Sequence, residues 1–414
     1  MPEAEHIEGR DDPWSLVVTA VGSALDDCER ALSDTPGGVA GEALAFSRFL
    51  RAELPRLLED WQTRRADPAR GAPVDQSADD RPVEVALPAT LQGHAAAVRD
   101  IAFSPDGTTL ASADNDGLVR LWDTRTGQGT GGLHDNHSLA ILSLAFSPAG
   151  TTLATATTAL TLWDVTSRTV TATLHPQNPA DRIWSVAHGP ADDLVVTGNN
   201  HSVQLWNPKT TRTTRTLTHP GSVFAVALSP DGTTLAGGGT DTHDVLVWHT
   251  RTGRRRLVLS GHTGTIHALA FSPDNRILAS AGYDRTIRLW DVHTGHAVAT
   301  LTGHTSAVMT LAFHPDGTVL ASGGAAVSIT PSGARYPDDH TVRLWNVLTK
   351  SLITTLTGHT GTVSSVAFHP DGTYLASGSF DTTIRLWPIN RPINHQPRPT
   401  TGRRRLLGRR HRHE

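Results

Sequence analysis

The stretch "GYDRTIRLWD", Gly282–Asp291, decides the fold because its pattern returns along the chain. Within it Asp284 stands six residues before Trp290, in a run where apolar and polar residues alternate. The same spacing recurs at Asp116 and Trp122, Asp339 and Trp345, and Asp381 and Trp387. Internal repetition is the first property to settle in such a chain, because it determines how every other segment is interpreted.

Tryptophans mark seven units, at positions 122, 163, 206, 248, 290, 345 and 387, spaced by 41 to 43 residues except for one interval of 55. Each unit carries a turn at the same offset: "SPDG" (104–107, 229–232), "SPAG" (147–150), "SPDN" (272–275), "HPDG" (314–317, 369–372) and the degenerate "GPAD" (189–192). Proline presets φ for a turn, and Gly or Asn takes its left-handed position. A period of about 40–45 residues with four short strands per unit is typical of a propeller blade. The sequence therefore predicts an all-β, seven-bladed propeller of four-stranded blades over residues 83–390.

The chain resembles the tryptophan–aspartate (WD) repeat β-propeller family over about 310 of its 414 residues. The signatures are the pairs Gly93-His94, Gly261-His262, Gly303-His304 and Gly358-His359, with Trp122-Asp123, Trp163-Asp164 and Trp290-Asp291. In this family the sequence repeat does not begin and end with the blade, so the segment before the first Gly-His pair supplies the outer strand of the last blade. The resemblance therefore implies that residues 83–91, which alternate at Val83, Val85 and Leu87, form the outer strand of the last blade and close the ring without free edges.

The resemblance also implies a buried chain of hydrogen bonds in four units, running from indole N–H to serine, imidazole and carboxylate. Its members are His94, Ser112, Asp116 and Trp122; His262, Ser280, Asp284 and Trp290; His304, Ser322, Asp339 and Trp345; and His359, Ser377, Asp381 and Trp387. Removing a member leaves its neighbour buried and unpaired, at a cost of about 1–3 kcal/mol. Val196 and Gly237 occupy the serine position in the third and fourth units, and the second unit lacks the aspartate.

Serine, histidine and aspartate together also suggest a hydrolase triad. The engaged serine and the four copies favour the structural interpretation. For metal binding, "HRH" (411–413) is the one local histidine cluster, and a solvated tail is the preferred interpretation. The sequence contains no phosphate-binding loop and no nucleotide fingerprint, so we expect no metal and no cofactor.

Residues on the top face are the candidate partner-binding surface. By the family pattern, one set follows the first apolar position of each inner strand: Arg99, Leu142, Trp184, Phe224, His267, Met309 and Ser364. A second set precedes the network aspartate: Asn115, Tyr283, Asp338 and Phe380. Aromatic and apolar residues of this kind are typical of an interface hot spot, although some of them could instead pack under neighbouring loops. The insertion at 325–337 is expected on the same face, as a lid or second contact.

The ends of the chain differ from the repeats. Apolar residues at steps of three and four predict helices in residues 14–32 and 44–61, hence a helical hairpin in region 1–65. A polar linker follows at 66–82, and the basic tail at 391–414 carries eight basic residues and one acidic residue. The tail is interpreted as a solvated, disordered end, or as a weak site for an acidic or anionic partner.

Composition narrows the functional classes. The repeat region is nearly neutral, with 22 acidic and 20 basic residues over 81–390, so it shows no general bias toward nucleic acid. Cys28 is the single cysteine, which favours a reducing compartment, the cytoplasm. The apolar run at 16–25 is too short for a membrane span, and no signal peptide is predicted.

Three functional hypotheses follow. The first is a non-catalytic scaffold that binds partner proteins on the top face of the propeller. The second is an enzyme with its active site at the axial mouth, where Arg99 and His267 are the polar candidates. The third is the sensor module of a signalling protein that docks through the helical hairpin, and this one rests on architecture alone.

Overall fold

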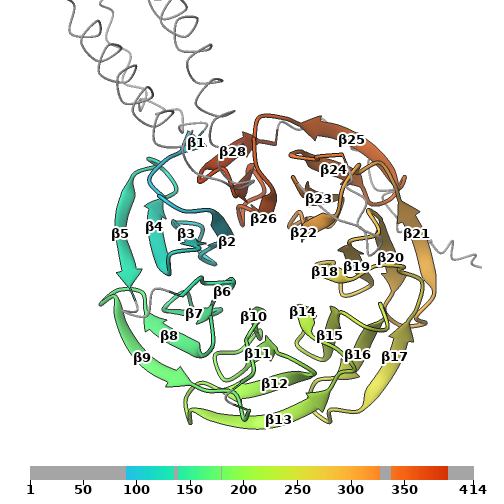
Figure 1. The fold of residues 1–414 in the computed structure, drawn as a ribbon, viewed down its shortest axis with the longest axis horizontal. Helices are drawn as coiled ribbons and strands as arrows, with labels where there is room; N and C mark the ends of the chain where they lie inside the picture. Colours follow the sequence, from blue (N-terminus) through green and yellow to red (C-terminus); the bar gives the residue numbers. More distant parts are fainter. Residues whose placement is uncertain (1–89, 135–138, 179, 327–336, 390–414) are drawn as a thin grey trace, which may run out of the picture. The chain divides into compact units, whose positions relative to one another are not determined.

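The computed structural model describes residues 90–134, 139–178, 180–326 and 337–389. In these residues seven four-stranded antiparallel sheets follow one another around a central axis (Figure 1). The predicted seven-bladed β-propeller is therefore confirmed. These ranges contain no helix long and apolar enough to cross a membrane. The expected helical hairpin, linker and basic tail lie outside the described residues.

We number the blades 1 to 7 in chain order, from an innermost strand at the axis to an outermost strand at the rim. Blade 1 contains β2 (Val98–Phe103), β3 (Thr109–Asp114), β4 (Leu118–Asp123) and β5 (Gly129–His134); blade 2 contains β6 (Ser143–Phe146), β7 (Thr152–Ala156), β8 (Leu160–Asp164) and β9 (Thr169–Leu174). Blade 3 contains β10 (Ser185–His188), β11 (Val195–Gly198), β12 (Ser202–Asn207) and β13 (Arg212–Thr218); blade 4 contains β14 (Val223–Leu228), β15 (Thr234–Gly239), β16 (Val245–His249) and β17 (Arg255–Leu259). Blade 5 contains β18 (Ile266–Phe271), β19 (Ile277–Gly282), β20 (Ile287–Asp291) and β21 (Ala297–Leu301); blade 6 contains β22 (Val308–Phe313), β23 (Val319–Gly324), β24 (Val342–Asn346) and β25 (Ser351–Leu356). Blade 7 contains β26 (Val363–Phe368), β27 (Tyr374–Ser379), β28 (Ile384–Pro388) and β1 (Thr90–Leu91).

The last blade takes its outer strand from the beginning of the described chain. In it β1 pairs antiparallel with β28, with Thr90 opposite Arg385 and Leu91 opposite Ile384. The first and last strands of the propeller therefore share one sheet, and this pairing closes the ring. The remainder of the expected closing strand, residues 83–89, lies outside the described residues.

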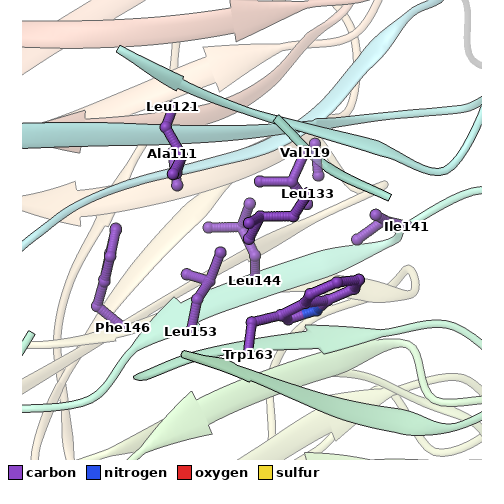
Figure 2. Close-up of a cluster of buried hydrophobic side chains, with 10 residues drawn as sticks. Ala111, Val119, Leu121, Leu133, Ile141, Leu144, Phe146, Leu153 and Trp163 are labelled. Carbon is purple, nitrogen blue, oxygen red and sulfur yellow. The ribbon is translucent and has the colours of Figure 1, made fainter. Parts of the chain in front are cut away.

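The hydrophobic core lies between neighbouring blades. Val119 and Leu133 of blade 1 pack with Leu144, Leu153 and Trp163 of blade 2 (Figure 2). Equivalent clusters occur at all seven blade–blade interfaces. A blade buries both faces of its sheet in this way, which explains why each unit needs its neighbours to be stable.

The glycine of each Gly-His pair has a positive φ and lies against an arginine on a neighbouring strand. Gly261 has φ of +151°, and a Cβ atom there would lie 2.6 Å from Arg288 Nη1. A side chain larger than hydrogen would displace that guanidinium, which itself lies over Trp290. The same pairing occurs between Gly93 and Arg120, Gly303 and Arg343, and Gly358 and Arg385.

Candidate functional site

A chain of hydrogen bonds runs from tryptophan to aspartate in four blades. In blade 5, Trp290 Nε1 donates to Ser280 Oγ at 2.8 Å, and His262 Nε2 lies 2.7 Å from the same oxygen. Nδ1 of His262 lies 2.7 Å from Asp284 Oδ2. Because Ser280 Oγ accepts the indole N–H, we assign its own proton to Nε2, so that the imidazole donates from Nδ1 to the carboxylate.

The same arrangement recurs in blades 6 and 7 at distances of 2.7–2.8 Å. Its members are His304, Ser322, Asp339 and Trp345, and His359, Ser377, Asp381 and Trp387. Burial alone would raise the pKa of each aspartate, but the hydrogen bond and charge of the histidine, with further donors, hold the pKa well below its ordinary value. The serines are fully buried and have two partners each, so they are structural groups and are inaccessible as nucleophiles.

In blade 1 the aspartate of the network is Asp114, and the prediction of Asp116 was wrong. His94 Nδ1 lies 2.7 Å from Asp114 Oδ2, while Nε2 lies 2.6 Å from Ser112 Oγ, which accepts from Trp122 Nε1 at 2.8 Å. Asp116 is exposed and donates its backbone N–H to Asp114 Oδ1. The histidine can be reached by a carboxylate at the end of β3, as in this blade, or by a carboxylate in the following turn, as in blade 5. Counting residues back from the tryptophan therefore does not show which aspartate belongs to the network.

Threonine takes the place of serine in blades 2 and 3. Trp163 Nε1 donates to Thr155 Oγ1 at 3.0 Å, and Trp206 Nε1 donates to Thr197 Oγ1 at 2.9 Å. The assignment of Val196 to this position was therefore wrong, because the β11–β12 turn is shorter and shifts the count from the tryptophan. In blade 4, Gly237 occupies the position and offers no hydroxyl. These three blades lack the full hydrogen-bonded chain.

Nine of the eleven residues predicted for the top face come together around one cavity of about 450 Å³ at the propeller axis, whereas Asn115 and Asp338 are not among its lining residues. We call this surface the axial mouth and define it by nine lining residues. They are Arg99, Leu142, Trp184, Phe224, His267, Tyr283, Met309, Ser364 and Phe380. Each is half-buried, so none is a fully exposed side chain. All seven blades contribute at least one of them.

A β-bulge turns several of these side chains toward the mouth. The pairing of the two innermost strands shifts register around Arg99, Phe224, His267, Met309 and Ser364. A bulge inserts one unpaired residue and re-aims its side chain. The corresponding residues of blades 2 and 3, Leu142 and Trp184, stand immediately before β6 and β10.

Blades 3 to 5 contribute a continuous row of aromatic rings, the aromatic arc: Trp184, Phe224, His267 and Tyr283. Trp184 meets Phe224 edge to face at 4.8 Å between ring centres. Phe224 stacks on His267 at 5.0 Å, and His267 meets Tyr283 edge to face at 5.0 Å. Such contacts orient the rings as one apolar surface. Trp184 Nε1 donates to Asn200 Oδ1 at 2.8 Å, so its polar edge is also fixed.

Two arginines lie over rings of mouth residues, one over Phe380 and one over Trp184. The guanidinium carbon of Arg99 lies 4.5 Å from the centre of the Phe380 ring, and Arg99 Nε donates to Asn115 Oδ1 at 2.5 Å. The guanidinium carbon of Arg182 lies 5.3 Å from the centre of the Trp184 ring. Sequence reasoning missed Arg182 because it lies in the segment before β10, outside the repeated positions.

His267 is a neutral ring in this environment. Burial lowers its pKa to about 4, because the surrounding rings cannot solvate an imidazolium. Within the described parts of the chain, no cluster of three or more His, Cys, Asp or Glu side chains is arranged to hold a metal ion. His267 therefore contributes an aromatic face to the mouth and is a weak base.

Asp100 lies beneath the mouth and joins three innermost strands. Its carboxylate accepts from the Leu144 backbone N–H at 2.8 Å and from Ser365 Oγ at 2.7 Å, and it also accepts its neighbour Ile101 N–H. Burial raises the pKa of Asp100 although these hydrogen bonds oppose the change. Sequence reasoning missed this residue. The sequence did offer a signal for Asp100, because other blades have a hydroxyl residue at the same position. These residues are Ser143, Ser185, Thr310 and Ser365.

The insertion at 325–337 lies within blade 6, between β23 and β24, and is described only at its ends. Ala326 N donates to Thr362 Oγ1 at 2.9 Å, and Asp339 N donates to Ala325 O at 2.9 Å. Both anchors lie at the start and end of the segment expected to form a lid. Residues 327–336, which carry that prediction, lie outside the described residues.

Comparison with known proteins gives a consistent family match. A family model described as "WD40: WD domain, G-beta repeat" matches residues 86–123, 168–207, 211–249, 253–291, 295–346 and 350–388, more than half of the chain. The segment of blade 2 between the first two matches folds as a blade nonetheless.

Relatives with curated names match over short segments. The chain is 42% identical over 69 residues to the periodic tryptophan protein 2 homolog of Schizosaccharomyces pombe, covering 16% of this chain and 8% of that protein. It is 51% identical over 51 residues to ribosome assembly protein 4 of Saccharomyces cerevisiae, covering 12% and 10%. It is 47% identical over 49 residues to a guanine nucleotide-binding protein subunit beta of S. pombe, covering 12% and 16%. The chain thus spans less than a fifth of each of these three relatives.

Proposed function

The chain belongs to the WD40-repeat family, and from this premise we propose that it is a non-catalytic scaffold whose axial mouth binds partner proteins. One observation carries the proposal. Side chains from all seven blades converge on a single cavity, and most of them are apolar or aromatic. Surfaces of this composition are typical of interface hot spots.

The fold does not dictate which residues line the mouth. The bulge position accepts arginine in blade 1, phenylalanine in blade 4 and serine in blade 7 without a change of strand pairing. The fold therefore does not require aromatic residues at the positions of the aromatic arc. Partner binding explains their presence, because large rings offer contact area at a low entropic cost.

The names of two relatives support a scaffold role. One is named as a ribosome assembly protein and one as a subunit of a guanine nucleotide-binding protein. Both names describe proteins that work within assemblies. Since the matches cover only short parts of those proteins, their partners are not transferred to this chain.

The enzyme hypothesis finds less support at the same mouth. It depends on Arg99 and His267 as polar groups. Among the described residues no carboxylate accepts a hydrogen bond from His267, and burial lowers the pKa of its imidazole to about 4, which makes it a weak base. A general base is most effective when its pKa lies near the working pH.

The proposal is tested by affinity capture with the full chain and a double variant, Trp184→Ala with Phe380→Ala. Each of these rings contributes a large face to the mouth, and such anchors commonly account for about 2 kcal/mol or more of binding, roughly thirtyfold in affinity. We expect the double variant to lose its partners while its thermal midpoint stays within a few degrees of wild type. The buried Trp–Ser–His–Asp networks are unchanged by either substitution.

A matched control removes apolar side chains elsewhere. Leu348 is 87% exposed and Val258 is 47% exposed, and both lie away from the mouth residues. The double variant Leu348→Ala with Val258→Ala should capture the same partners as wild type. Retention of every partner by the mouth variant would show that docking occurs at another surface.

Two broader proposals rest on the sequence. We propose a cytoplasmic location because the chain has a single cysteine, and a role in signalling because a propeller joined to a helical hairpin suits a modular sensor. An acidic or anionic partner for the arginine-rich tail is a further proposal, based on charge alone. Localisation of a tagged full-length chain, with and without residues 391–414, tests the first and third.

A further inference from the structure

A second cavity, of about 760 Å³, is formed by blades 5 and 6 and shares no lining residue with the axial mouth. Its walls include Asp274, in the turn after β18, and Asp316, in the turn after β22. The mouth residues His267 and Met309 stand at the beginning of the same two strands. The second cavity therefore lies on the propeller face opposite the axial mouth, and we call it the lower cavity.

Exposed apolar side chains gather at the lower cavity. Leu348, in the β24–β25 turn, is 87% exposed, and Val298 of β21 is 37% exposed; both line the cavity. Leu352 and Ile353 of β25 are exposed as well, so blades 5 and 6 carry four of the seven exposed large apolar side chains in the described residues. Exposed apolar residues are normally scattered singly, and a cluster of them marks a surface that another segment covers.

Two carboxylates border the lower cavity and are ionised at neutral pH. The hydrogen bond from Ser272 Oγ, at 2.6 Å, lowers the pKa of Asp274. Burial would raise the pKa of Asp316, but hydrogen bonds within the β22–β23 turn hold it below its ordinary value. Asp316 contacts His314 Nδ1 at 2.7 Å and its side chain is still 38% exposed. Lys350 is the one lysine of the lining and donates to a backbone carbonyl of β21, so both carboxylates are available to a basic segment.

The described part of the propeller ends at the wall of the lower cavity. Ile389 is a lining residue, and its backbone N–H donates to Thr373 O at 2.9 Å, which fixes this end of the chain to blade 7. The residues that follow Ile389 therefore start beside the cavity. A segment tethered by a few residues has an effective concentration on the order of millimolar, so weak contacts are enough to dock it.

The sequence after Ile389 complements the lower cavity. In "NRPINHQPR" (390–398), Ile393 is the one large apolar residue, and Arg391 and Arg398 stand on either side of it. The segment contains no acidic residue. Its two prolines fix their own φ angles, so less conformational entropy is lost when the segment docks.

We propose that residues 390–398 dock in the lower cavity, where Ile393 packs on Leu348 and covers the exposed apolar side chains. Four residues extend by about 14 Å at most, which places Ile393 within the cavity that Ile389 itself lines. Removal of both apolar side chains from water stabilises the docked state. The inference goes beyond the proposed function, because it assigns a second site on the opposite face and does not involve the axial mouth.

The course of the chain assigns the two arginines. The chain leaves blade 7 at Ile389 and meets blade 6 before blade 5 (Figure 1), so Arg391 pairs with Asp316 and Arg398 with Asp274. Ion pairs at an exposed surface contribute little to affinity, so the apolar contact holds the segment and the two pairs set its direction. Docking would keep the arginine-rich stretch 403–412 on the face opposite the mouth.

The first test places a thiol in the segment of the full chain. Cys28 is the single cysteine, so Cys28→Ser with Ile393→Cys leaves one thiol, whose alkylation by iodoacetamide is compared with that of a synthetic peptide of residues 388–400 carrying the same substitution. We expect alkylation to be about tenfold slower in the chain, as for a segment docked about nine-tenths of the time. Adding Leu348→Asn should bring the rate to within about twofold of the peptide. Val170→Asn is the matched control, because Val170 is 46% exposed on β9 of blade 2, and it should leave alkylation slow.

The second test keeps Ile393 and places the thiol on the cavity instead. In a chain with Cys28→Ser and Leu348→Cys, adding Ile393→Asn should accelerate alkylation about tenfold, because the side chain that covers the thiol is lost. Arg391→Gln with Arg398→Gln should accelerate it only about twofold to fivefold, as expected for surface ion pairs. Thermal midpoints check that each variant is folded.

Three outcomes would overturn the inference. Alkylation as fast as in the peptide, together with no effect of Ile393→Asn on the thiol at position 348, would show that the segment does not dock. Slow alkylation that Leu348→Asn leaves unchanged would place the segment at another surface. Protection that disappears on dilution would assign the lower cavity to a second copy of the chain. None of these results changes partner capture by the mouth, so the two proposals fail separately.

Discussion

The guanidinium carbon of Arg99 lies 4.5 Å from the centre of the Phe380 ring, and this contact joins blade 1 to blade 7 at the axial mouth. Arg99 stands in the bulge of β2, whereas Phe380 follows β27. The two residues thus meet across the junction at which the ring closes. One contact fixes a cation of the mouth and also bridges the first and last blades.

Replacement of Phe380 by leucine separates these two roles. Leucine retains apolar volume but has no π face, so a cation–π contact of about 0.5–1 kcal/mol is lost. We expect the thermal midpoint to fall by a few degrees at most, while the affinity for a captured partner protein weakens because Arg99 is less well oriented. Calorimetry and a titration on the same preparation check both. An unchanged affinity would show that Asn115 alone positions the arginine.

The buried network makes a different prediction in blade 1. Asp114→Ala leaves the Nδ1–H of His94 without an acceptor, and we expect a loss of about 1–3 kcal/mol in the free energy of unfolding. Asp116→Ala, two residues away, removes an exposed carboxylate and should change that free energy by no more than about 0.5 kcal/mol. Chemical denaturation of the two variants decides between them, since equal losses would contradict the assignment of Asp114.

Sequence reasoning succeeded where a repeat made a residue's environment predictable. The tryptophan period and the Pro-containing turns indicated seven blades, because each blade must present the same faces to its neighbours. It erred at Val196, where the turn is one residue shorter, and at Asp116, where an aspartate at the end of a strand takes the place of one in the turn. Which aspartate reaches the histidine, and how many residues the hairpin turn contains, depend on the folded backbone. Residue spacing along the chain does not determine either of them.

The candidate site was predictable only in part for the same reason. The mouth residues occupy repeated positions, so the family pattern located them. Arg182 and Asn200 lie in segments that vary between repeats, and their approach to Trp184 depends on the course of those loops.

Stability should fall as the pH decreases below about 6.5, with His188 as a main cause. Burial lowers the pKa of His188 to about 4, and both of its ring nitrogens are buried without partners among the described residues. The unfolded chain binds a proton near pH 6.5, whereas the folded chain does so only near pH 4, so protonation favours unfolding between those values. Each such histidine contributes a slope of up to about 1.4 kcal/mol per pH unit. His267 has the same property.

The variant His188→Phe isolates this contribution. Five blades have phenylalanine at the equivalent end of the innermost strand: Phe103, Phe146, Phe271, Phe313 and Phe368. We expect the variant to be more stable than wild type at pH 7 and to show a shallower decline between pH 6.5 and 4. The aspartates of the buried networks do not contribute to the loss of stability between pH 6.5 and 4. Their pKa values are lowered in the folded chain, so their protonation destabilises the fold only near and below the unfolded pKa of about 3.8. Parallel slopes for the two proteins would show that His188 is not buried as a neutral ring.

Closure of the ring gives the last prediction. Leu91 is 4% exposed and packs with Val98, Ile101 and Ile384, so Leu91→Ala should cost about 2–5 kcal/mol. Leu301 is the matched residue of blade 5, at the same place on the outermost strand and 3% exposed, and its truncation should cost a similar amount.

The two leucine variants should differ in self-association. β21 follows β20 of its own blade after a short turn, whereas β1 comes from the start of the described chain, and among the described residues Thr90 and Leu91 pair it with β28. Weakening β1 therefore uncovers the edge of β28, and an uncovered edge pairs with other chains. We expect Leu91→Ala to form oligomers detectable by light scattering, and Leu301→Ala to remain as wild type. Deletion of residues 1–91 should lower the thermal midpoint further than deletion of residues 1–82, and equal midpoints would show that this strand does not close the ring.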